Sequence, residues 1–225
     1  MQGPPSSPLP FSRTAAAARH YDPRMVGIVL GAGASKRLGR PKQTLPFGDT
    51  TLLGHVLRDV GDSALERVVL VVGGAADEAL AAIEPGRATI ARNDSYGSGC
   101  ASSLLAGLDA AGDAEAVMLL LGDMPGVQPS LIDEVAGAWN KRRPWAAVTS
   151  YRGELGHPFV FAAAAFADLR SLHGDKAVWK LIERDPERVE RIEVDRELPR
   201  DVDTWEDYEA ALSALGRSGP ARAAG

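Results

Sequence analysis

The chain has 225 residues, 45% of them hydrophobic, which suits one domain with a sizeable core. Its net charge of −5 argues against nonspecific nucleic-acid binding, which needs a basic surface. The single cysteine, Cys100, excludes an intramolecular disulfide and a thiolate zinc cluster, and the four histidines show no metal-ligand spacing. The longest apolar runs are too short to span a bilayer, so we expect a cytoplasmic protein with no membrane or nucleic-acid partner.

The two ends of the chain differ from its middle. Residues 1–24 carry five prolines and three serines, and we expect this segment to be a disordered tail. Met25 stands directly before the first apolar run, so the native chain could also begin there. Residues 25–215 are expected to form a single domain, and residues 216–225 a second, loose tail.

Apolar runs alternate with helical patterns between these ends. Met25 to Leu30 predicts a buried strand, and apolar residues at helical spacing follow it from Leu52 to Val60. Further strands are predicted at 67–72, 88–91, 116–121, 146–150 and 189–194, and further helices at 77–83, 101–111, 129–141, 162–169 and 177–183. Residues 156–161 predict a loop that enters a strand.

The segment after Asp201 predicts the last helix of the chain, which should end at about Leu215. Thr204 fits the N-cap position of this helix, and Asp207 stands at the matching capping-box position. The side chain of each residue would then accept a hydrogen bond from the backbone of the other.

Strands that are apolar throughout and alternate with helices predict a parallel sheet covered on both faces. The expected fold class is therefore α/β, with a mostly parallel sheet. Ligands of such sheets bind at the carboxyl ends of the strands. Residues 31–42 and 122–125 both lie at such ends, so a cationic loop and the carboxylate of Asp123 should share one rim of the sheet.

The loop after the first strand has the composition of a phosphate-binding site. Glycines let backbone N–H groups approach an anion, and cations neutralise it. The glycines are Gly31, Gly33 and Gly39, and the cations are Lys36, Arg37, Arg40 and Lys42. The loop lacks the Gly-Lys-Ser/Thr of a Walker A motif, and Lys36 stands where a dinucleotide fingerprint has its third glycine. Both familiar phosphate motifs are therefore excluded.

Residues 30–46 instead resemble the signature of the MobA-like nucleotidyltransferases, Leu-Ala-Ala-Gly-x-Ser-x-Arg-x-Gly-x-x-Lys followed by Leu-Pro. Five further segments resemble this family in the family's order: Gly99 with Ser102-Ser103-Leu104 and Gly107, Leu121-Gly-Asp-Met-Pro125, Gly156-His-Pro, Leu172-x-Gly-Asp175, and Asp201-Val-Asp-Thr-x-Glu-Asp207. Together they cover roughly residues 25–215. The resemblance implies a Rossmann-like nucleotidyltransferase fold.

Within this family the chain most closely resembles the molybdenum cofactor cytidylyltransferases, since Gly-His-Pro and Leu-x-Gly-Asp are typical of that branch. The resemblance implies transfer of CMP from CTP to molybdopterin, with release of pyrophosphate and with Mg²⁺ as cofactor. The chain departs from the pattern at Gly31, where alanine is usual, at Met124, where glutamine is common, and at Trp205, which replaces proline. Because Gly31 lies in the base-reading loop, the choice of base stays open.

The resemblance also assigns the site residues. It implies that Arg37 and Lys42 bind the triphosphate and stabilise charge as pyrophosphate leaves, and that Asp123 is catalytic and binds the metal with Asp203. Lys36 and Arg40 are expected to be surface charges. The implied nucleotide-binding residues are Leu30, Gly31, Ala32, Gly33, Lys42, Ser102 and Ser103, and the implied substrate-binding residues are His157 and Asp175.

Three alternatives stay open. The first keeps the reaction but changes the base or acceptor, as in guanylyl or sugar-phosphate nucleotidyl transfer. The second is an oxidoreductase-type role, against which the missing third glycine argues. The third is a nucleotide-binding accessory protein without turnover. For the cytidylyltransferase that the resemblance implies, the expected partners are CTP or another nucleoside triphosphate, a molybdopterin-type phosphate acceptor and, further, a molybdoenzyme or its chaperone.

Overall fold

The computed structural model describes residues 24–33, 35 and 37–218. The tail predicted over residues 1–24 lies outside the described residues except for Arg24, and so do Lys36 and residues 219–225 of the second predicted tail. The described strands are β1 (Met25–Leu30), β2 (Pro46–Phe47), β3 (Thr50–Thr51), β4 (Arg67–Val72), β5 (Ala88–Arg92), β6 (Ala116–Leu121), β7 (Ala146–Tyr151), β8 (Glu154–Ala162) and β9 (Val189–Val194). The described α-helices are α1 (Leu52–Asp62), α2 (Ala76–Ala81), α3 (Cys100–Ala111), α4 (Pro129–Arg142), α5 (Phe166–Arg170), α6 (Ala177–Arg184) and α7 (Trp205–Ser218). Short 3-10 turns lie at Lys42–Thr44, Tyr96–Ser98, Ala163–Ala165 and Pro186–Arg188.

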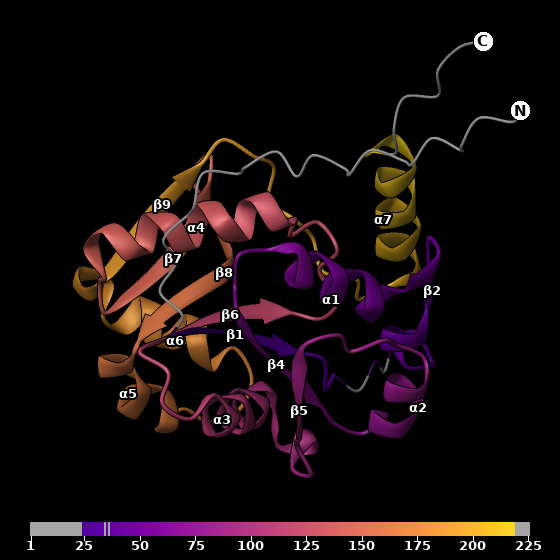
Figure 1. The fold of residues 1–225 in the computed structure, drawn as a ribbon, viewed down its shortest axis with the longest axis horizontal. Helices are drawn as coiled ribbons and strands as arrows, with labels where there is room; N and C mark the ends of the chain where they lie inside the picture. Colours follow the sequence, from indigo (N-terminus) through magenta and orange to yellow (C-terminus); the bar gives the residue numbers. More distant parts are fainter. Residues whose placement is uncertain (1–23, 34, 36, 219–225) are drawn as a thin grey trace, which may run out of the picture.

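A seven-stranded sheet in the order β5-β4-β1-β6-β8-β7-β9 forms the centre of the described chain (Figure 1). β1 pairs in parallel with β4 on one side and with β6 on the other. β8 alone runs against its neighbours β6 and β7, and β9 is parallel to β7. The prediction of a mostly parallel α/β sheet is therefore confirmed. The direction of connection reverses at β1, and ligands of such sheets bind at this kind of switch point.

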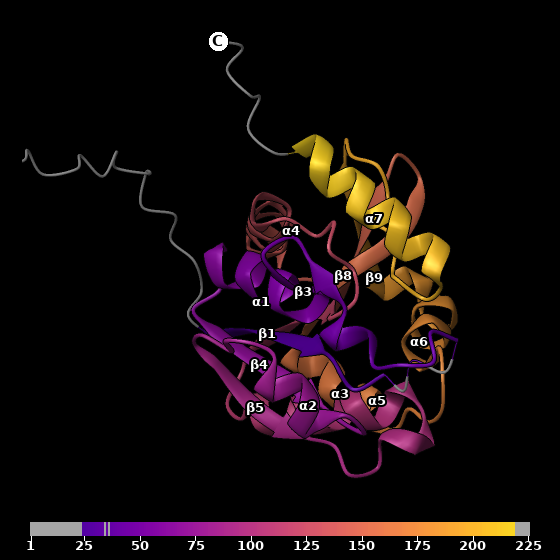
Figure 2. The same ribbon diagram turned by 90° about the vertical axis from the view of Figure 1, so that its right-hand side faces the viewer.

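Helices cover both faces of the sheet, and each face has its own apolar core (Figures 1 and 2). On one face α1 and α4 pack on the sheet through side chains such as Leu53, Val60 and Trp139. On the other face α3, α5 and α6 contribute Leu104, Leu169 and others. The central strands β1, β4 and β6 are buried from both sides, which is why their sequences are apolar nearly throughout, whereas the edge strands β5 and β9 are partly exposed.

α7 packs beside the sheet as a third, smaller cluster against the β2–β3 hairpin and the start of α1. Its N-terminus has the predicted capping box: the Asp207 amide donates to Thr204 Oγ1 over 3.2 Å, and the Thr204 amide donates to Asp207 Oδ2 over 2.8 Å. α7 continues to Ser218, past the predicted end at about Leu215. The cluster places the segment before α7 beside the loop that follows β1.

The prediction for residues 156–161 was wrong in one respect, because the Gly156-His-Pro segment lies inside a strand and not in a loop. β8 begins at Glu154, directly after a two-residue turn in which Arg152 and Gly153 both have positive φ, 51° and 97°. Such a turn matches the twist of an antiparallel pair and therefore sends β8 back along β7. The short β2–β3 pair was also missing from the prediction.

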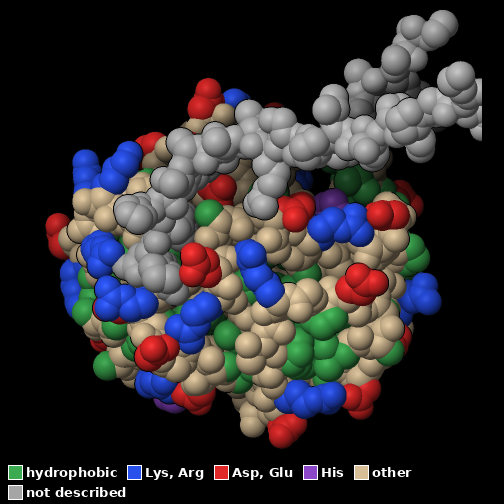
Figure 3. Space-filling model, in the orientation of Figure 1, with side chains coloured by type: hydrophobic (Ala, Val, Ile, Leu, Met, Phe, Trp, Pro, Cys, Tyr) green, Lys and Arg blue, Asp and Glu red, His purple; other side chains and the backbone are tan. Residues whose placement is uncertain are grey.

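Charged side chains of both signs are interspersed over the described part of the face shown in Figure 3. Within the described ranges, no helix is long and apolar enough to cross a membrane.

Candidate active site

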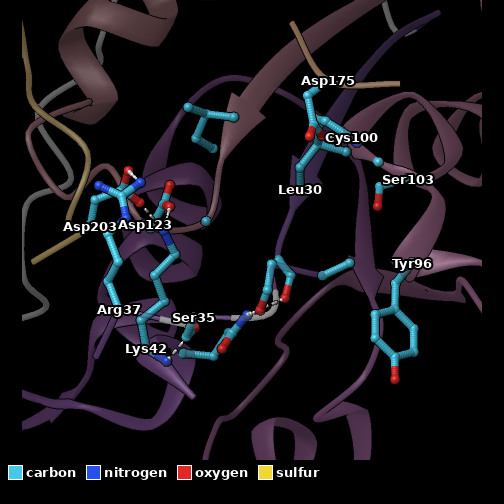
Figure 4. Close-up of a pocket in the computed structure, with 18 of the residues that line it drawn as sticks. Leu30, Ser35, Arg37, Lys42, Tyr96, Cys100, Ser103, Asp123, Asp175 and Asp203 are labelled. Atoms are coloured by element: carbon cyan, nitrogen blue, oxygen red, sulfur yellow. Dashed lines mark hydrogen bonds and ion pairs between the residues drawn. The ribbon is translucent and has the colours of Figure 1, made fainter. Parts of the chain in front are cut away.

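A pocket of about 590 Å³ opens where the carboxyl ends of β1 and β6 meet. Its walls come from segments far apart in the sequence: the loop after β1, the end of β6, the loop before α3, and single residues near positions 175 and 203. Figure 4 shows Arg37, Lys42, Asp123 and Asp203 gathered on one side. We call these four residues the charged end of the pocket.

The charged end is built around the Lys42 ammonium. Lys42 Nζ makes an ion pair with Asp123 Oδ2, lies 2.9 Å from Asp203 Oδ1, and donates to the Val202 carbonyl over 3.1 Å. Arg37 adds a second cation, because its Nη2 donates to Asp203 Oδ2 over 2.7 Å. Two carboxylates and two cations from three distant segments therefore meet at one point.

Backbone contacts explain why these distant segments meet. The Val202 amide donates to the Asp123 carbonyl over 2.9 Å, so the segment before α7 is tied to the end of β6. The Lys42 amide donates to Ser35 Oγ over 2.9 Å, which closes the cationic loop on itself. Gly122 is required here, since a Cβ atom on it would lie 2.9 Å from Leu53 Cδ1 and 3.0 Å from a backbone oxygen of β1.

The charges at this end shift each other's pKa values. Burial alone would lower the pKa of Lys42, but Asp123 and Asp203 outweigh it and raise the pKa above its ordinary value. Burial raises the pKa of Asp123, although the Lys42 charge opposes this. The pKa of Asp203 is lowered, chiefly by its hydrogen bond from Lys42. At neutral pH Lys42 is therefore a cation.

The opposite wall of the pocket is built differently. Figure 4 shows Asp175, Cys100, Ser103 and Tyr96 there, away from the charged end. Asp175 Oδ1 accepts a hydrogen bond from the Cys100 amide over 3.0 Å, so it caps the N-terminus of α3. Gly99 has φ of 105°, and a Cβ atom on it would lie 2.8 Å from the carbonyl carbon of Gly174. The close approach of these two segments therefore requires a glycine at position 99.

Asn93 stabilises the loop that leads into α3. Its Nδ2 donates to Ser102 Oγ over 2.9 Å and to Ser103 Oγ over 3.0 Å. Ser103 lines the pocket, whereas Ser102 is not among the lining residues. Ser102 Oγ also donates to the Gly99 carbonyl over 2.8 Å, so its observed contacts hold the loop.

His157 is not among the residues that line the pocket. Its ring is buried, lies with Nδ1 3.2 Å from the Leu119 carbonyl, and packs on Phe159 with ring centroids 4.0 Å apart. Burial lowers the pKa of His157 to about 4, so the ring is neutral at neutral pH. These contacts favour a structural role in the sheet over contact with a ligand.

The structure thus brings most residues of the predicted site to one pocket: Leu30, Gly31, Ala32, Gly33, Arg37, Lys42, Ser103, Asp123, Asp175 and Asp203. Arg40, expected to be a surface charge, is exposed. Sequence reasoning missed the lining residues Gln43 and Tyr96 and the buried Asn93. The aromatic ring of Tyr96 in a loop of small residues was a usable signal, whereas nothing in the sequence marks Gln43 or Asn93.

The donor set of the charged end fits a hard divalent cation. Asp123 and Asp203 already share one positive group, the Lys42 ammonium, and so can face a common cation. Mg²⁺ and related cations prefer carboxylate oxygens together with phosphate oxygens and water. Among the described residues there is no cluster of three or more His, Cys, Asp or Glu with metal-holding geometry. The two carboxylates would therefore need oxygens from a ligand to complete the coordination.

Comparison with known proteins defines the class. The model of the MobA-like NTP transferase domain matches residues 27–189, so the chain belongs to this nucleotidyltransferase family. The chain is 31% identical over 194 residues to nicotine blue oxidoreductase of Paenarthrobacter nicotinovorans, covering 82% of this chain and 94% of that protein. It is 28% identical to a probable molybdenum cofactor guanylyltransferase of Mycobacterium marinum, covering 79% and 93%. It is 29% identical to the molybdenum cofactor cytidylyltransferase of Escherichia coli, covering 59% and 67%.

Solved structures agree with this placement. The structure of a homologue of Mycobacterium tuberculosis rv0371c from Mycobacterium sp. strain JC1 matches with a TM-score of 0.79 and 42% identity, covering 87% of this chain and 98% of that one. The structure of Rv0371c from M. tuberculosis in complex with manganese matches with a TM-score of 0.72 and 35% identity, covering 84% and 98%. The prediction of a nucleotidyltransferase fold is confirmed.

Proposed function

We propose that this nucleotidyltransferase transfers CMP from CTP to the terminal phosphate of a molybdopterin-type acceptor and releases pyrophosphate. The observation that carries the proposal is the charged end of the pocket, where Lys42 and Arg37 face Asp123 and Asp203. A triphosphate needs cations and a metal needs carboxylates, and this end offers both within one pocket.

The reaction needs little besides positioning and charge. An oxygen of the acceptor phosphate forms a new bond to the α-phosphorus of the triphosphate, and the bond between the α-phosphorus and the bridging oxygen to the β-phosphate breaks. The acceptor phosphate is already anionic near neutral pH, so no general base is required. Negative charge grows on the leaving pyrophosphate, and Arg37 and Lys42 would neutralise it.

A divalent cation, Mg²⁺ in our proposal, would be held by Asp123 and Asp203. When bound, it would supply further neutralisation of the phosphate oxygens. The structure of the similar Rv0371c from M. tuberculosis in complex with manganese supports a divalent cation as a ligand of this chain. Lys42 and the cation would compete for the same carboxylate oxygens of Asp123 and Asp203. The oxygens of the triphosphate would then provide further negative charge for both cations.

The choice of CTP and of the acceptor rests on resemblance. The Gly156-His-Pro and Leu172-x-Gly-Asp175 segments are those typical of the cytidylyl-transferring branch, and a cytidylyltransferase and a guanylyltransferase both stand among the relatives. Asp175 lines the wall opposite the charged end, where it would lie toward the acceptor. The buried ring of His157, with Nδ1 3.2 Å from the Leu119 carbonyl, would support β6, whose end carries Asp123. A molybdoenzyme or its chaperone would receive the product.

A binding titration tests the proposal. We expect CTP with Mn²⁺ or Mg²⁺ to bind more tightly than GTP, ATP or UTP by isothermal titration calorimetry. Tighter binding of GTP would move the assignment to guanylyl transfer. Binding of a nucleotide without pyrophosphate release with any acceptor would favour the accessory reading. Oxidation or reduction of nicotine blue by the purified protein would favour the redox activity that the name of the P. nicotinovorans relative states.

A further inference from the structure

The Gln43 side chain is buried and hydrogen-bonded at the pocket, but the proposed function gives it no role. It follows Lys42 in a 3-10 turn, is only 4% exposed, and lines the pocket. Its Nε2 donates to the Gly31 carbonyl over 2.8 Å and to the Gly33 carbonyl over 2.9 Å. Both acceptors belong to the loop that leaves the sheet after β1.

These two bonds are the polar contacts of the amide. Gln43 Oε1 is buried and has no hydrogen-bond partner among the described residues. A buried oxygen without a partner destabilises the folded protein, and an apolar side chain of similar size would fill the space without this cost. The glutamine is therefore explained by its two donors, and both donors go to the loop.

The part of the loop that Gln43 holds, residues 30–33, has no polar side chain at the pocket. Residues 30–33 all line the pocket and are leucine, glycine, alanine and glycine. Any polar recognition by this wall must therefore come from backbone N–H and C=O groups. The Gly31 amide is fixed by its bond to the Val71 carbonyl at 2.8 Å, but beyond Gly31 the loop has left the sheet. Gln43 ties the backbone on both sides of Ala32.

We propose that Gln43 is a positioning residue that sets the base selectivity of the pocket by fixing the backbone of residues 31–33. The inference rests on the proposed function, because it requires a nucleoside triphosphate as ligand. The charged end binds phosphates, which all nucleoside triphosphates share, whereas the base differs among them. A residue that holds the backbone of residues 31–33 but none of the ion-paired side chains should therefore change base selectivity more than phosphate affinity.

The test compares Gln43→Met with a matched Gln128→Met control. Methionine keeps the length of the side chain and removes both donors, and Gln128 is an exposed residue before α4 without a side-chain cap bond. Dissociation constants are measured for CTP, GTP, ATP, UTP and inorganic tripolyphosphate, each with Mn²⁺. We expect Gln43→Met to reduce the ratio between the best and worst nucleotide by about tenfold, the effect of losing two ordinary hydrogen bonds. Tripolyphosphate should bind as in the wild type, and Gln128→Met should change neither quantity.

Three results separate the inference from the function on which it rests. An unchanged nucleotide ratio in a folded Gln43→Met variant would overturn the inference while leaving the proposed function intact. A parallel loss of tripolyphosphate and of every nucleotide would also overturn it, since the role would then be general packing. No nucleotide binding by the wild type would remove the proposed function and the inference with it. Gln43→Glu, which keeps the shape but places acceptors against the two carbonyls, should give the same loss of selectivity and serves if the methionine variant does not fold.

Discussion

The charged end of the pocket is formed by side chains, whereas backbone groups form much of the rest of its lining. At the charged end, side chains from the loop after β1, the end of β6 and the segment before α7 form ion pairs with one another. Away from these ion pairs, backbone groups predominate: Gln43 donates to the Gly31 and Gly33 carbonyls, and Asp175 accepts from the Cys100 amide. Ion pairs between side chains therefore define the charged end, whereas hydrogen bonds fix the backbone in the rest of the pocket.

This difference separates two tasks. Phosphates and metals are recognised by charge, which tolerates small displacements because electrostatic attraction acts over several ångströms. Bases are recognised by hydrogen bonds and fit, which depend on backbone placement to a fraction of an ångström. Substitutions at the charged end should therefore remove turnover, whereas substitutions behind the other wall should change selectivity or stability.

The largest effect is expected from Asp123→Asn. The amide keeps the size of the side chain but removes the negative charge that pairs with Lys42 and would hold the cation. We expect pyrophosphate release to fall by about 10²- to 10³-fold, measured at saturating Mg²⁺. Asp113→Asn, which removes an exposed ion pair with Arg67, is the control and should have little effect. Unchanged turnover of Asp123→Asn would refute the metal-binding role of Asp123.

Lys42→Met should have opposite effects on nucleotide turnover and on the binding of a divalent cation. Nucleotide turnover should fall by about 10²-fold, because a cation facing the leaving pyrophosphate is lost. Affinity for Mn²⁺ without nucleotide should rise by up to about tenfold, because the ammonium no longer competes for the oxygens of Asp123 and Asp203. Electron paramagnetic resonance of free Mn²⁺ measures the second effect, with the exposed Lys180→Met as control. Weaker Mn²⁺ binding in Lys42→Met would contradict a shared set of oxygens.

A smaller effect is expected from Asp175→Ala on the opposite wall. The substitution leaves the Cys100 amide at the start of α3 without its acceptor. Loss of such a cap should lower the free energy of unfolding by about 1 kcal/mol. Urea denaturation measures this change. Asp175→Asn retains an oxygen acceptor and should recover most of the stability, and a failure to do so would show that the carboxylate charge matters more than the cap.

His157 should make the stability of the protein depend on pH. Its pKa is about 4 in the folded protein because of burial, and about 6.5 in an unfolded chain. Between these values the unfolded chain binds a proton that the folded protein does not, so stability is lost as pH falls from 6.5 towards 4, by up to about 3 kcal/mol. Burial raises the pKa of Asp59 to about 6, which affects stability in the opposite direction. A variant of His157 keeps Asp59, so a comparison with the wild type cancels this contribution.

Urea unfolding of the wild type and of His157→Gln at pH 7 and pH 4.5 isolates the histidine term. The wild type should lose more stability than the variant over this interval. Equal losses would contradict a buried neutral ring. A KM for the acceptor that rises about tenfold in His157→Gln would instead support the acceptor-binding role that the sequence predicted.

The alternation of strands and helices was predictable because most strands here are buried on both faces and are therefore apolar throughout. The same pattern placed Lys42 and Asp123 on one rim, and the structure confirms that their side chains meet there. The capping box of α7 was also predictable, since a box depends on residues three positions apart.

The reversal of β8 and the roles of Gln43 and Asn93 were not predicted. The turn at Arg152-Gly153 is only a weak hairpin signal in the sequence, because an arginine in the left-handed region is uncommon. Gln43 and Asn93 bond to groups whose neighbourhood exists only in the folded protein. Their type and spacing alone therefore could not reveal them.

The most direct test of the central claim is pyrophosphate release by the purified protein with Mg²⁺, a molybdopterin-type phosphate acceptor and each nucleoside triphosphate in turn. The account predicts release with CTP that depends on the acceptor and on the cation and is lost in Asp123→Asn. Wild-type protein that binds the nucleotide but releases no pyrophosphate under any of these conditions would contradict it.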